Sequence, residues 1–221
     1  STSKIFDQYN RKFNYLRLAV NERCNLRCIY CMPEKGINLL SKDQYLSEVE
    51  IKRIISIFSQ MGVSKIRFTG GEPLLREDIT ELIRYAKNQC KIDQVHLTTN
   101  GILLNKYIEQ LSNVGLSGIN ISLDSLKPQR FEKISRRDKL YQVLDNILLV
   151  QESTIPSLKI NVVFMKGFND DELLDFVEFT KTNNLTVRFI ELMPFDAHQV
   201  WKTGKFYKSA DIVNDLKHKI E

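Results

Sequence analysis

Short runs rich in β-branched and aliphatic residues alternate with longer stretches in which apolar residues recur at helical spacing. Six runs have the composition of buried strands and span 15–20, 63–69, 94–98, 118–123, 158–164 and 186–191. Helices are predicted from the apolar sets Val49, Ile51, Ile54, Ile55, Phe58 and Ile79, Leu82, Ile83, Ala86, and over 104–114, 140–150, 171–182 and 210–220. This alternation predicts an α/β domain of parallel strands joined by right-handed crossovers.

The chain length limits how far such a sheet can close. At roughly 30 residues per strand and helix unit, six units use most of the 221 residues, whereas a closed eight-unit barrel needs about 250. We therefore expect a partial, TIM-like (β/α)6 barrel. The predicted divisions are an N-terminal extension over 1–14, the barrel core over 15–193, and the start of a truncated C-terminal region over 194–221.

Alternate residues on the predicted strands separate into an apolar and a polar set. Helices cover the outside of a parallel barrel, so the apolar set should face them and the polar set should face the interior. Cations in that interior are costly unless they are paired or liganded. We therefore expect Arg17, Arg67, Lys159 and Arg188 to meet an anionic ligand, with Glu191 or Asp124 neutralising part of the charge. Alternatively, single side chains among them reach solvent at the barrel ends or pair only with acidic neighbours.

Composition adds few constraints. The net charge of +5 is spread along the chain and does not by itself indicate a nucleic-acid or membrane partner, but it is compatible with an anionic small substrate. No run approaches the roughly 18 apolar residues of a membrane helix, and the first 13 residues lack a secretory signal. We expect a soluble, cytoplasmic protein, or one of an organelle matrix in a eukaryote.

Three cysteines, Cys24, Cys28 and Cys31, form a C-x3-C-x2-C triplet after the first predicted strand. In a reducing compartment, clustered cysteines are typically metal ligands rather than disulfides. A four-iron cluster normally takes four thiolates, so three would leave one iron free to bind another molecule. A zinc knuckle or three unrelated thiols remain alternatives, although no fourth Cys or His lies nearby. Cys90 stands apart and is expected to be an ordinary buried thiol.

Further polar motifs end the next three strands, where the active sites of such barrels lie. Gly70-Gly71-Glu72-Pro73 combines two glycines, which permit close approach of backbone to a ligand, with a carboxylate that could accept from an ammonium group. Thr98 and Ser122 place small polar groups on the same rim. Each motif also has a structural interpretation: a turn at Gly70 or at Asn100-Gly101, and a helix cap at Asp124.

Six segments together resemble one family. They are Leu16-Arg17-Leu18, the stretch from Cys24 to Met32-Pro33, Ile66 to Leu74, Leu97 to Gly101, Asn120 to Leu126, and Arg188 to Met193. This combination resembles the MoaA family, the GTP 3′,8-cyclases of molybdenum cofactor biosynthesis, within the radical S-adenosylmethionine (SAM) superfamily.

The resemblance implies a role for individual residues. It implies that Cys24, Cys28 and Cys31 hold a [4Fe-4S] cluster whose fourth iron binds SAM. The residues that would contact SAM are Tyr30, Gly70, Gly71, Glu72, Ser122 and Met193, and those that would contact GTP are Arg17, Arg67, Thr98 and Lys159. Three of these four GTP residues were also selected by strand alternation.

The implied activity is that of a radical SAM lyase. A 5′-deoxyadenosyl radical abstracts the ribose 3′ hydrogen of GTP, and the product is (8S)-3′,8-cyclo-7,8-dihydro-GTP. The family also carries a second [4Fe-4S] cluster on three C-terminal cysteines, whereas this chain has no cysteine after Cys90. We therefore expect the chain as given to be incomplete for catalysis and to cleave SAM poorly or uncoupled from cyclisation.

The resemblance also implies partners: a low-potential electron donor of flavodoxin or ferredoxin type, and cyclic pyranopterin monophosphate synthase as the next enzyme of the pathway. Neither nucleic acid nor membrane is expected, and a homodimer is left open. Two other functions remain as alternatives. One is a single-cluster radical SAM enzyme acting on another nucleotide, a peptide or RNA, and the other is a non-catalytic iron-sulfur or zinc-binding module.

Overall fold

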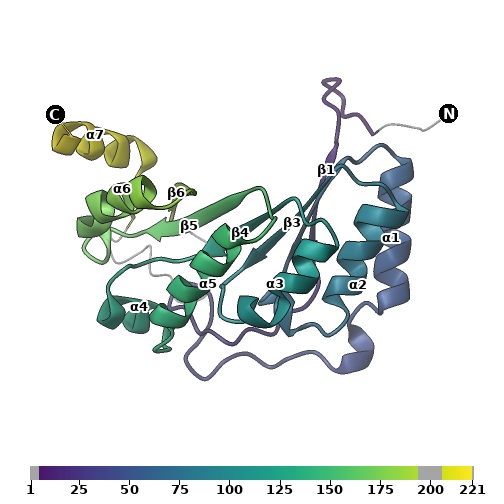
Figure 1. Ribbon diagram of the computed structural model, residues 1–221, viewed down its shortest axis with the longest axis horizontal. Helices are drawn as coiled ribbons and strands as arrows, with labels where there is room; N and C mark the ends of the chain where they lie inside the picture. The colour runs from purple at the N-terminus through teal and green to yellow at the C-terminus, as the bar shows by residue number, and fades with distance from the viewer. Residues whose placement is uncertain (1–4, 194–205, 221) are drawn as a thin grey trace.

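Six parallel strands form one sheet in chain order in the computed structural model, which describes residues 5–193 and 206–220 (Figure 1). The strands are β1 (Tyr15–Ala19), β2 (Lys65–Thr69), β3 (Gln94–Thr99), β4 (Gly118–Ser122), β5 (Leu158–Phe164) and β6 (Thr186–Glu191). All six predicted strands are confirmed, each within two residues of its expected ends. Because β1 and β6 are the edges and do not pair, the sheet is an open, partial barrel, as predicted.

Seven α-helices accompany the strands within residues 5–193 and 206–220. They are α1 (Glu48–Gln60), α2 (Ile79–Arg84), α3 (Leu104–Asn113), α4 (Pro128–Ser135), α5 (Leu140–Glu152), α6 (Leu173–Thr182) and α7 (Ser209–Ile220). A π-helical turn over Tyr85–Gln89 extends α2. Helix α4 was missed by the sequence analysis, although Pro128 at its first position and the buried Phe131 and Ile134 are signals for it.

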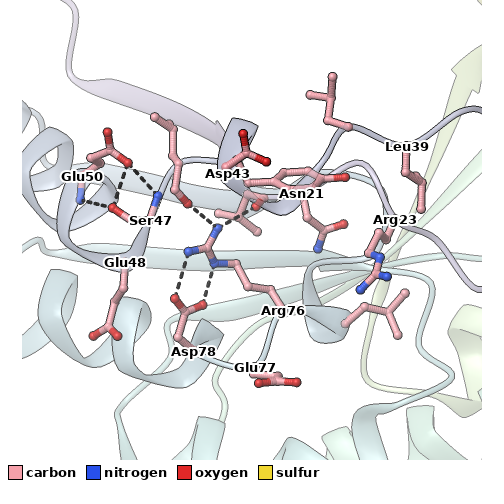
Figure 2. Close-up of a pocket in the computed structure, with 15 residues that line it drawn as sticks. Asn21, Arg23, Leu39, Asp43, Ser47, Glu48, Glu50, Arg76, Glu77 and Asp78 are labelled. Atoms are coloured by element: carbon pink, nitrogen blue, oxygen red, sulfur yellow. Dashed lines mark hydrogen bonds and ion pairs between the residues drawn. The ribbon is translucent and has the colours of Figure 1, made fainter.

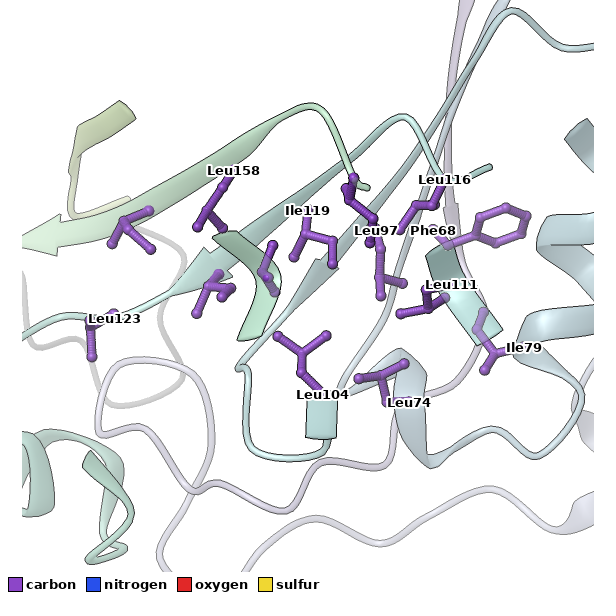
Figure 3. Packing of buried hydrophobic residues seen from close by; sticks show 14 of the residues in the cluster. Phe68, Leu74, Ile79, Leu97, Leu104, Leu111, Leu116, Ile119, Leu123 and Leu158 are labelled. Atoms are coloured by element: carbon purple, nitrogen blue, oxygen red, sulfur yellow. The ribbon is translucent and has the colours of Figure 1, made fainter. Parts of the chain in front are cut away.

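The predicted division of each strand into two faces is confirmed. Most apolar residues of β2 to β5, among them Phe68, Leu97 and Ile119, are fully buried between the sheet and the helices (Figure 3). The polar set lies on the opposite, concave face. One residue of the helical stripes was assigned wrongly: Val49 is 76% exposed. It precedes the buried Ile51 by two residues, which is about 200° around the helix, so it points away from the core.

The ends of the described chain differ in how they pack. Before β1, Phe6 and Lys12 form a single antiparallel bridge around a turn stabilised by Asp7. At the other end, α7 packs against α6 and β6, and Tyr207 stacks on Phe164 of β5 with ring centroids 5.8 Å apart. In the described part of the chain, no helix combines the length and apolar character that crossing a membrane requires.

A buried carboxylate connects the loop after β4 to the loop after β5. Glu172 is fully buried and accepts hydrogen bonds from the Ser125 hydroxyl and the Leu126 backbone N–H, both at 2.7 Å. Arg130 of α4 pairs with it at 2.6 Å and also pairs with Asp171, which is 54% exposed. The carboxylate accepts from each of these donors, so its burial is compensated. Through Arg130 it holds α4 against the segment that follows β5.

Removing Glu172 should therefore cost far more stability than removing Asp171, although both bind Arg130. We expect Glu172→Ala to lower the free energy of unfolding by about 2–4 kcal/mol, because it leaves buried donors unpaired. Asp171→Ala should cost less than about 1 kcal/mol. Urea denaturation of the two variants checks this, and equal losses would show that burial of Glu172 is not what matters.

Candidate functional site

The cysteine loop and the glycine loop lie against each other at the carboxyl ends of β1 and β2. Two backbone hydrogen bonds join them, from Gly71 N to Asn21 O at 2.7 Å and from Glu72 N to Arg23 O at 2.6 Å. The Asn21 side chain donates in return to Glu72 O at 3.0 Å. The loop that carries the three cysteines is therefore fixed at its start by the backbone of the next loop.

Gly70 and Gly71 are required by this contact. A Cβ on Gly70 would lie 2.4 Å from Asn21 O, and one on Gly71 would lie 2.2 Å from Arg23 O, both backbone atoms that cannot move aside easily. Gly70 also has a φ of +150°, which side chains rarely adopt. The sequence analysis expected these glycines to admit a ligand. In the structure, the backbone of the cysteine loop packs directly against them.

Glu72 has protein partners where an ammonium group was expected. Its side chain is 1% exposed and accepts from the Leu74 N–H, the Thr99 hydroxyl and the Asn100 N–H at 3.1, 2.7 and 2.7 Å. It thereby ties the glycine loop to the end of β3. Burial, opposed by these hydrogen bonds, raises the pKa of Glu72 to about 7.

Helix α4 holds the other side of the cysteine loop. Arg27 N and Ile29 N donate to Ser135 O and Ile134 O at 3.0 and 2.9 Å. Arg136, in the left-handed conformation at the end of α4, donates to Arg27 O at 2.7 Å and to Met32 O at 2.9 Å. The glycine loop on one side and α4 on the other thus fix the backbone of the cysteine loop by hydrogen bonds, so the positions of its thiols are preorganised.

The three thiols lie in one loop but differ in exposure: Cys24 and Cys28 are partly buried and Cys31 is exposed. Burial raises the pKa of Cys24, Cys28 and Cys31, and the charges of the other two thiols add to the rise at Cys28, so the sulfurs influence one another. The Asn100 amide donates to Cys24 Sγ at 3.8 Å. Hydrogen bonds of this kind stabilise cluster-bound thiolates.

This donor set fits a cluster better than a single ion. Within the described residues, no three His, Cys, Asp or Glu side chains are grouped to hold one metal ion. In a four-iron cluster each thiolate binds a different iron, so its ligands need not converge on one point. Three thiols without a fourth ligand in the described part of the chain therefore suit a cluster with one open iron, whereas a closed zinc site would need four converging ligands.

Tyr30 links the cysteine loop to the end of β4. Its hydroxyl donates to Asp124 Oδ2 at 2.6 Å, and Asp124 Oδ1 accepts from Val163 N of β5 at 2.8 Å. Burial raises the pKa of Asp124 to about 6. Asp124 is thus neither a helix cap nor a partner of the barrel cations: it holds Tyr30 in place.

The concave face gathers the four cations singled out by strand alternation. Arg67, Lys159 and Arg188 are partly buried and Arg17 is exposed, and none of the four makes an ion pair within the described ranges. We call Arg17, Arg67, Lys159 and Arg188 the cationic face. Burial and the charge of Arg67 lower the pKa of Arg188, as expected for cations held together without an acid.

Neutral amides, rather than acids, contact these cations. Arg188 donates to Asn161 Oδ1 through Nε at 2.9 Å and Nη2 at 2.5 Å. Asn120 is almost fully buried between the guanidinium groups of Arg67 and Arg188, and its oxygen accepts from both when the amide is oriented for them, at 3.2 Å from Arg188 Nη2. The amides orient the guanidinium groups but leave their charge uncompensated.

The other predicted site residues differ in how close they lie to the cationic face. Thr98 lies 3.4 Å from the Asn120 amide, on the cationic side of the sheet, and Ser122 is partly buried at the end of β4. Glu191 accepts a hydrogen bond from Ser209 N at 2.5 Å, and its predicted part in balancing the cations stays a prediction. Met193 is 65% exposed beyond β6. The strand alternation could also have identified His96, Asn120 and Asn161, which share the concave face.

A separate cleft of about 600 Å³ lies beside the glycine loop, and Figure 2 shows the side chains around it. Arg76 is its central contact: it pairs with Asp78 and donates to Val20 O and Leu46 O, both at 3.0 Å. Its lining includes none of the cationic face. Arg76 therefore braces the segment between the cysteines and α1, outside the concave face.

Comparison with known proteins gives consistent matches. The model of the radical SAM superfamily matches residues 18–180. Among curated proteins, the GTP 3′,8-cyclase of Limosilactobacillus fermentum is 44% identical over 214 residues, which cover 96% of this chain and 64% of that protein. The GTP 3′,8-cyclase of Lactiplantibacillus plantarum is 47% identical over 86% of this chain and 58% of its own length. This chain thus spans about 60% of the length of these two relatives.

Other matches come from eukaryotes and from solved structures. Molybdenum cofactor biosynthesis protein 1 of Dictyostelium discoideum is 43% identical over 97% of this chain and 34% of that protein. Streptococcus suis SuiB bound to S-adenosylmethionine superposes with a TM-score of 0.70 at 19% identity, over 94% of this chain and 47% of SuiB. At that identity the structural match supports the fold alone.

The buried Glu72 leads to a prediction about pH. Because its folded pKa of about 7 exceeds the ordinary value of 4.5, the folded chain holds a proton between pH 4.5 and 7 that the unfolded chain has released. Stability from Glu72 is therefore lost as the pH rises through this window, by about 3 kcal/mol.

Glu72→Gln cannot titrate, so its free energy of unfolding should lack this fall, although the variant loses hydrogen bonds at every pH. Urea denaturation of the metal-free chain at several pH values between 4.5 and 7.5 measures the difference between parent and variant. Glu77→Gln, at an exposed neighbour, should follow the parent. An identical pH dependence in the Glu72 variant would contradict the proposed burial of this carboxyl.

Proposed function

The chain belongs to the radical SAM superfamily, and from this premise we propose that it provides the SAM-binding and triphosphate-binding part of a GTP 3′,8-cyclase. The observation that carries the proposal is the cationic face: four cations that have no acidic partner among the residues the structure describes, on the concave side of a sheet whose strand ends carry the cysteine triplet. Identities of 42–47% to GTP 3′,8-cyclases support the choice of nucleotide.

Superfamily membership implies a [4Fe-4S] cluster and SAM as cofactors. We assign Cys24, Cys28 and Cys31 as the cluster ligands, with the fourth iron open to SAM. When bound, the cluster would supply an electron and SAM would supply the carbon radical that can remove a hydrogen atom from the substrate. The protein contributes a loop fixed on both sides, so the thiols need not reorganise when they bind iron.

The SAM contacts assigned from the resemblance fit the structure to different degrees. Tyr30 belongs to the cysteine loop and is bonded to Asp124, and Ser122 is the last residue of β4, which supports both assignments. Gly70 and Gly71 can offer backbone groups. Glu72 would act indirectly, by holding the glycine loop in place, because its side-chain oxygens are already bonded. Met193 would have to close over the ligand from its exposed position.

The cationic face would bind the triphosphate of GTP. Guanidinium groups suit phosphate oxygens because they donate paired hydrogen bonds, and Asn120 and Asn161 hold two of them in orientation. Thr98 and Lys159 add a hydroxyl and an ammonium donor. Binding the anion also relieves the repulsion among the cations, so a highly charged ligand should bind more tightly than a weakly charged one.

The remaining parts of the proposal rest on the resemblance. A second cluster would bind the guanine end of GTP, and this chain offers it no cysteine triplet, since Cys90 is the only cysteine outside residues 24–31. We keep the division into an extension over 1–14, a core over 15–193 and a C-terminal region from 194. A low-potential electron donor would reduce the cluster, and cyclic pyranopterin monophosphate synthase would consume the product.

The cationic face generates the test of this function. Arg67→Gln and Lys159→Gln should each weaken GTP binding about tenfold or more, because each removes a charge-assisted contact worth about 1.5–3 kcal/mol. Neither should lower the stability of the ligand-free chain much, since each also removes repulsion. Lys106→Gln makes the same charge change on the exposed side of α3 and should bind GTP like the parent.

Calorimetric titration with GTP measures these affinities, and anaerobic assays with SAM and dithionite measure 5′-deoxyadenosine with and without GTP. The proposal fails if both variants bind GTP as the parent does. It also fails if SAM cleavage by the full-length protein is indifferent to GTP and yields no cyclised nucleotide.

A further inference from the structure

A histidine lies in the same row as two members of the cationic face. The strand register aligns Arg17 of β1 with Arg67 of β2, Arg67 with His96 of β3, and His96 with Gly118 of β4. Residues at one level of neighbouring strands point to the same side of a sheet. Arg17, Arg67 and His96 therefore form a continuous row on the concave face, and this row ends at a residue without a side chain.

His96 has an unsatisfied nitrogen in this row. The side chain is 8% exposed, and its Nε2 atom is buried and has no hydrogen-bond partner in the described part of the chain. The Nε atom of the adjacent Arg67 is also buried without a partner there. Each such group costs about 1–3 kcal/mol when it is left unpaired. Two unpaired polar atoms on residues that are partners in the strand register point to a ligand that completes this position.

Gly118 makes room for the imidazole. A Cβ on Gly118 would lie 2.8 Å from His96 Nδ1 and 2.9 Å from the Ser157 Cβ, so no larger residue fits beside the ring. With Nδ1 packed toward Gly118, the opposite ring nitrogen, Nε2, is the one left to meet a ligand. Because Gly118 has no side chain, the His96 ring fits beside it with Nε2 facing the cationic row.

The surroundings keep His96 uncharged. Burial and the positive charges of Lys65, Arg67 and Lys159, with a further contribution from Lys87, lower its pKa to about 4. A neutral imidazole carries one N–H and can donate one hydrogen bond without adding a further positive charge to a face whose cations have no acidic partner among the described residues. Such a donor suits a phosphate oxygen held between the neighbouring cations.

We propose that His96 is a further substrate-binding residue, whose Nε2–H donates to an oxygen of the phosphate group bound by Arg67. The ligand class is a polyphosphate, which under the proposed function is the triphosphate of GTP. His96 would add a directional contact at the level of Arg17 and Arg67, and would satisfy a group that the ligand-free structure leaves unpaired.

Three variants separate this role from a packing role. His96→Leu keeps bulk but removes the donor, and should weaken binding about tenfold, or about 1.4 kcal/mol. His96→Gln keeps an N–H near the position of Nε2 and should bind within about threefold of the parent. Gly118→Ala should displace the ring and weaken binding without removing any donor. Circular dichroism and urea denaturation establish that each variant folds.

The probes are GTP and inorganic tripolyphosphate, titrated calorimetrically into the 221-residue chain. Tripolyphosphate reports on the anion site without guanosine, SAM or a cluster. If its binding depends on His96 while SAM cleavage by the full-length protein is indifferent to GTP, this inference stands and the proposed substrate is wrong. Equal affinity of the parent and His96→Leu for both probes overturns the inference.

Nitrogen-15 NMR of the imidazoles gives a second readout, because the chain has only three histidines and His96→Leu identifies the signal of interest. The proposal expects a protonated Nε2 in a neutral ring, with its N–H resonance shifted on binding tripolyphosphate. An Nε2 that is unprotonated in the complex would overturn it, because His96 would then accept from the unpaired Nε of Arg67 and serve only to position that guanidinium group.

Discussion

The contact between two loop backbones is the constraint on which the rest of the site depends. Gly71 and Glu72 donate to the carbonyls of Asn21 and Arg23, and the approach is so close that neither Gly70 nor Gly71 can carry a side chain. Glu72 extends the connection to the end of β3, and Tyr30 with Asp124 extends it to β4. The cysteine loop is therefore positioned by the ends of four strands, which is how a long loop can present thiols to a cluster.

Electrostatics then separates the site into two regions. Around the cysteines, buried acids at Glu72 and Asp124 face neutral donors, and their pKa values rise to about 7 and 6. On the concave face, cations face neutral amides and a neutral histidine. The second arrangement costs stability in the ligand-free chain and becomes favourable when an anion binds. A face of this kind is explained by its ligand rather than by the fold.

Much of the fold was predictable because it follows from local patterns. Alternation of Ile66 and Phe68 with Arg67 assigns both faces of β2, and the same rule assigns the other strands. Helix α4 was missed because it is short and buries only two apolar side chains, Phe131 and Ile134. The protein partners of Glu72 could not be predicted, because Thr99 and Asn100 are distant in sequence and meet it only after the strands pair. The position of Gly118 beside His96 likewise follows only from the register of β3 and β4, which the sequence does not show.

The central claim is that the cysteine triplet holds a four-iron cluster whose open iron binds SAM. Electron-nuclear double resonance of the reduced, anaerobically reconstituted chain tests it most directly, with SAM labelled by nitrogen-15 in its amino group and oxygen-17 in its carboxylate. The account predicts hyperfine coupling of both labels to the cluster, and loss of the cluster in Cys28→Ala but not in Cys90→Ala. A cluster without either coupling, or a colourless chain that binds zinc, would contradict it.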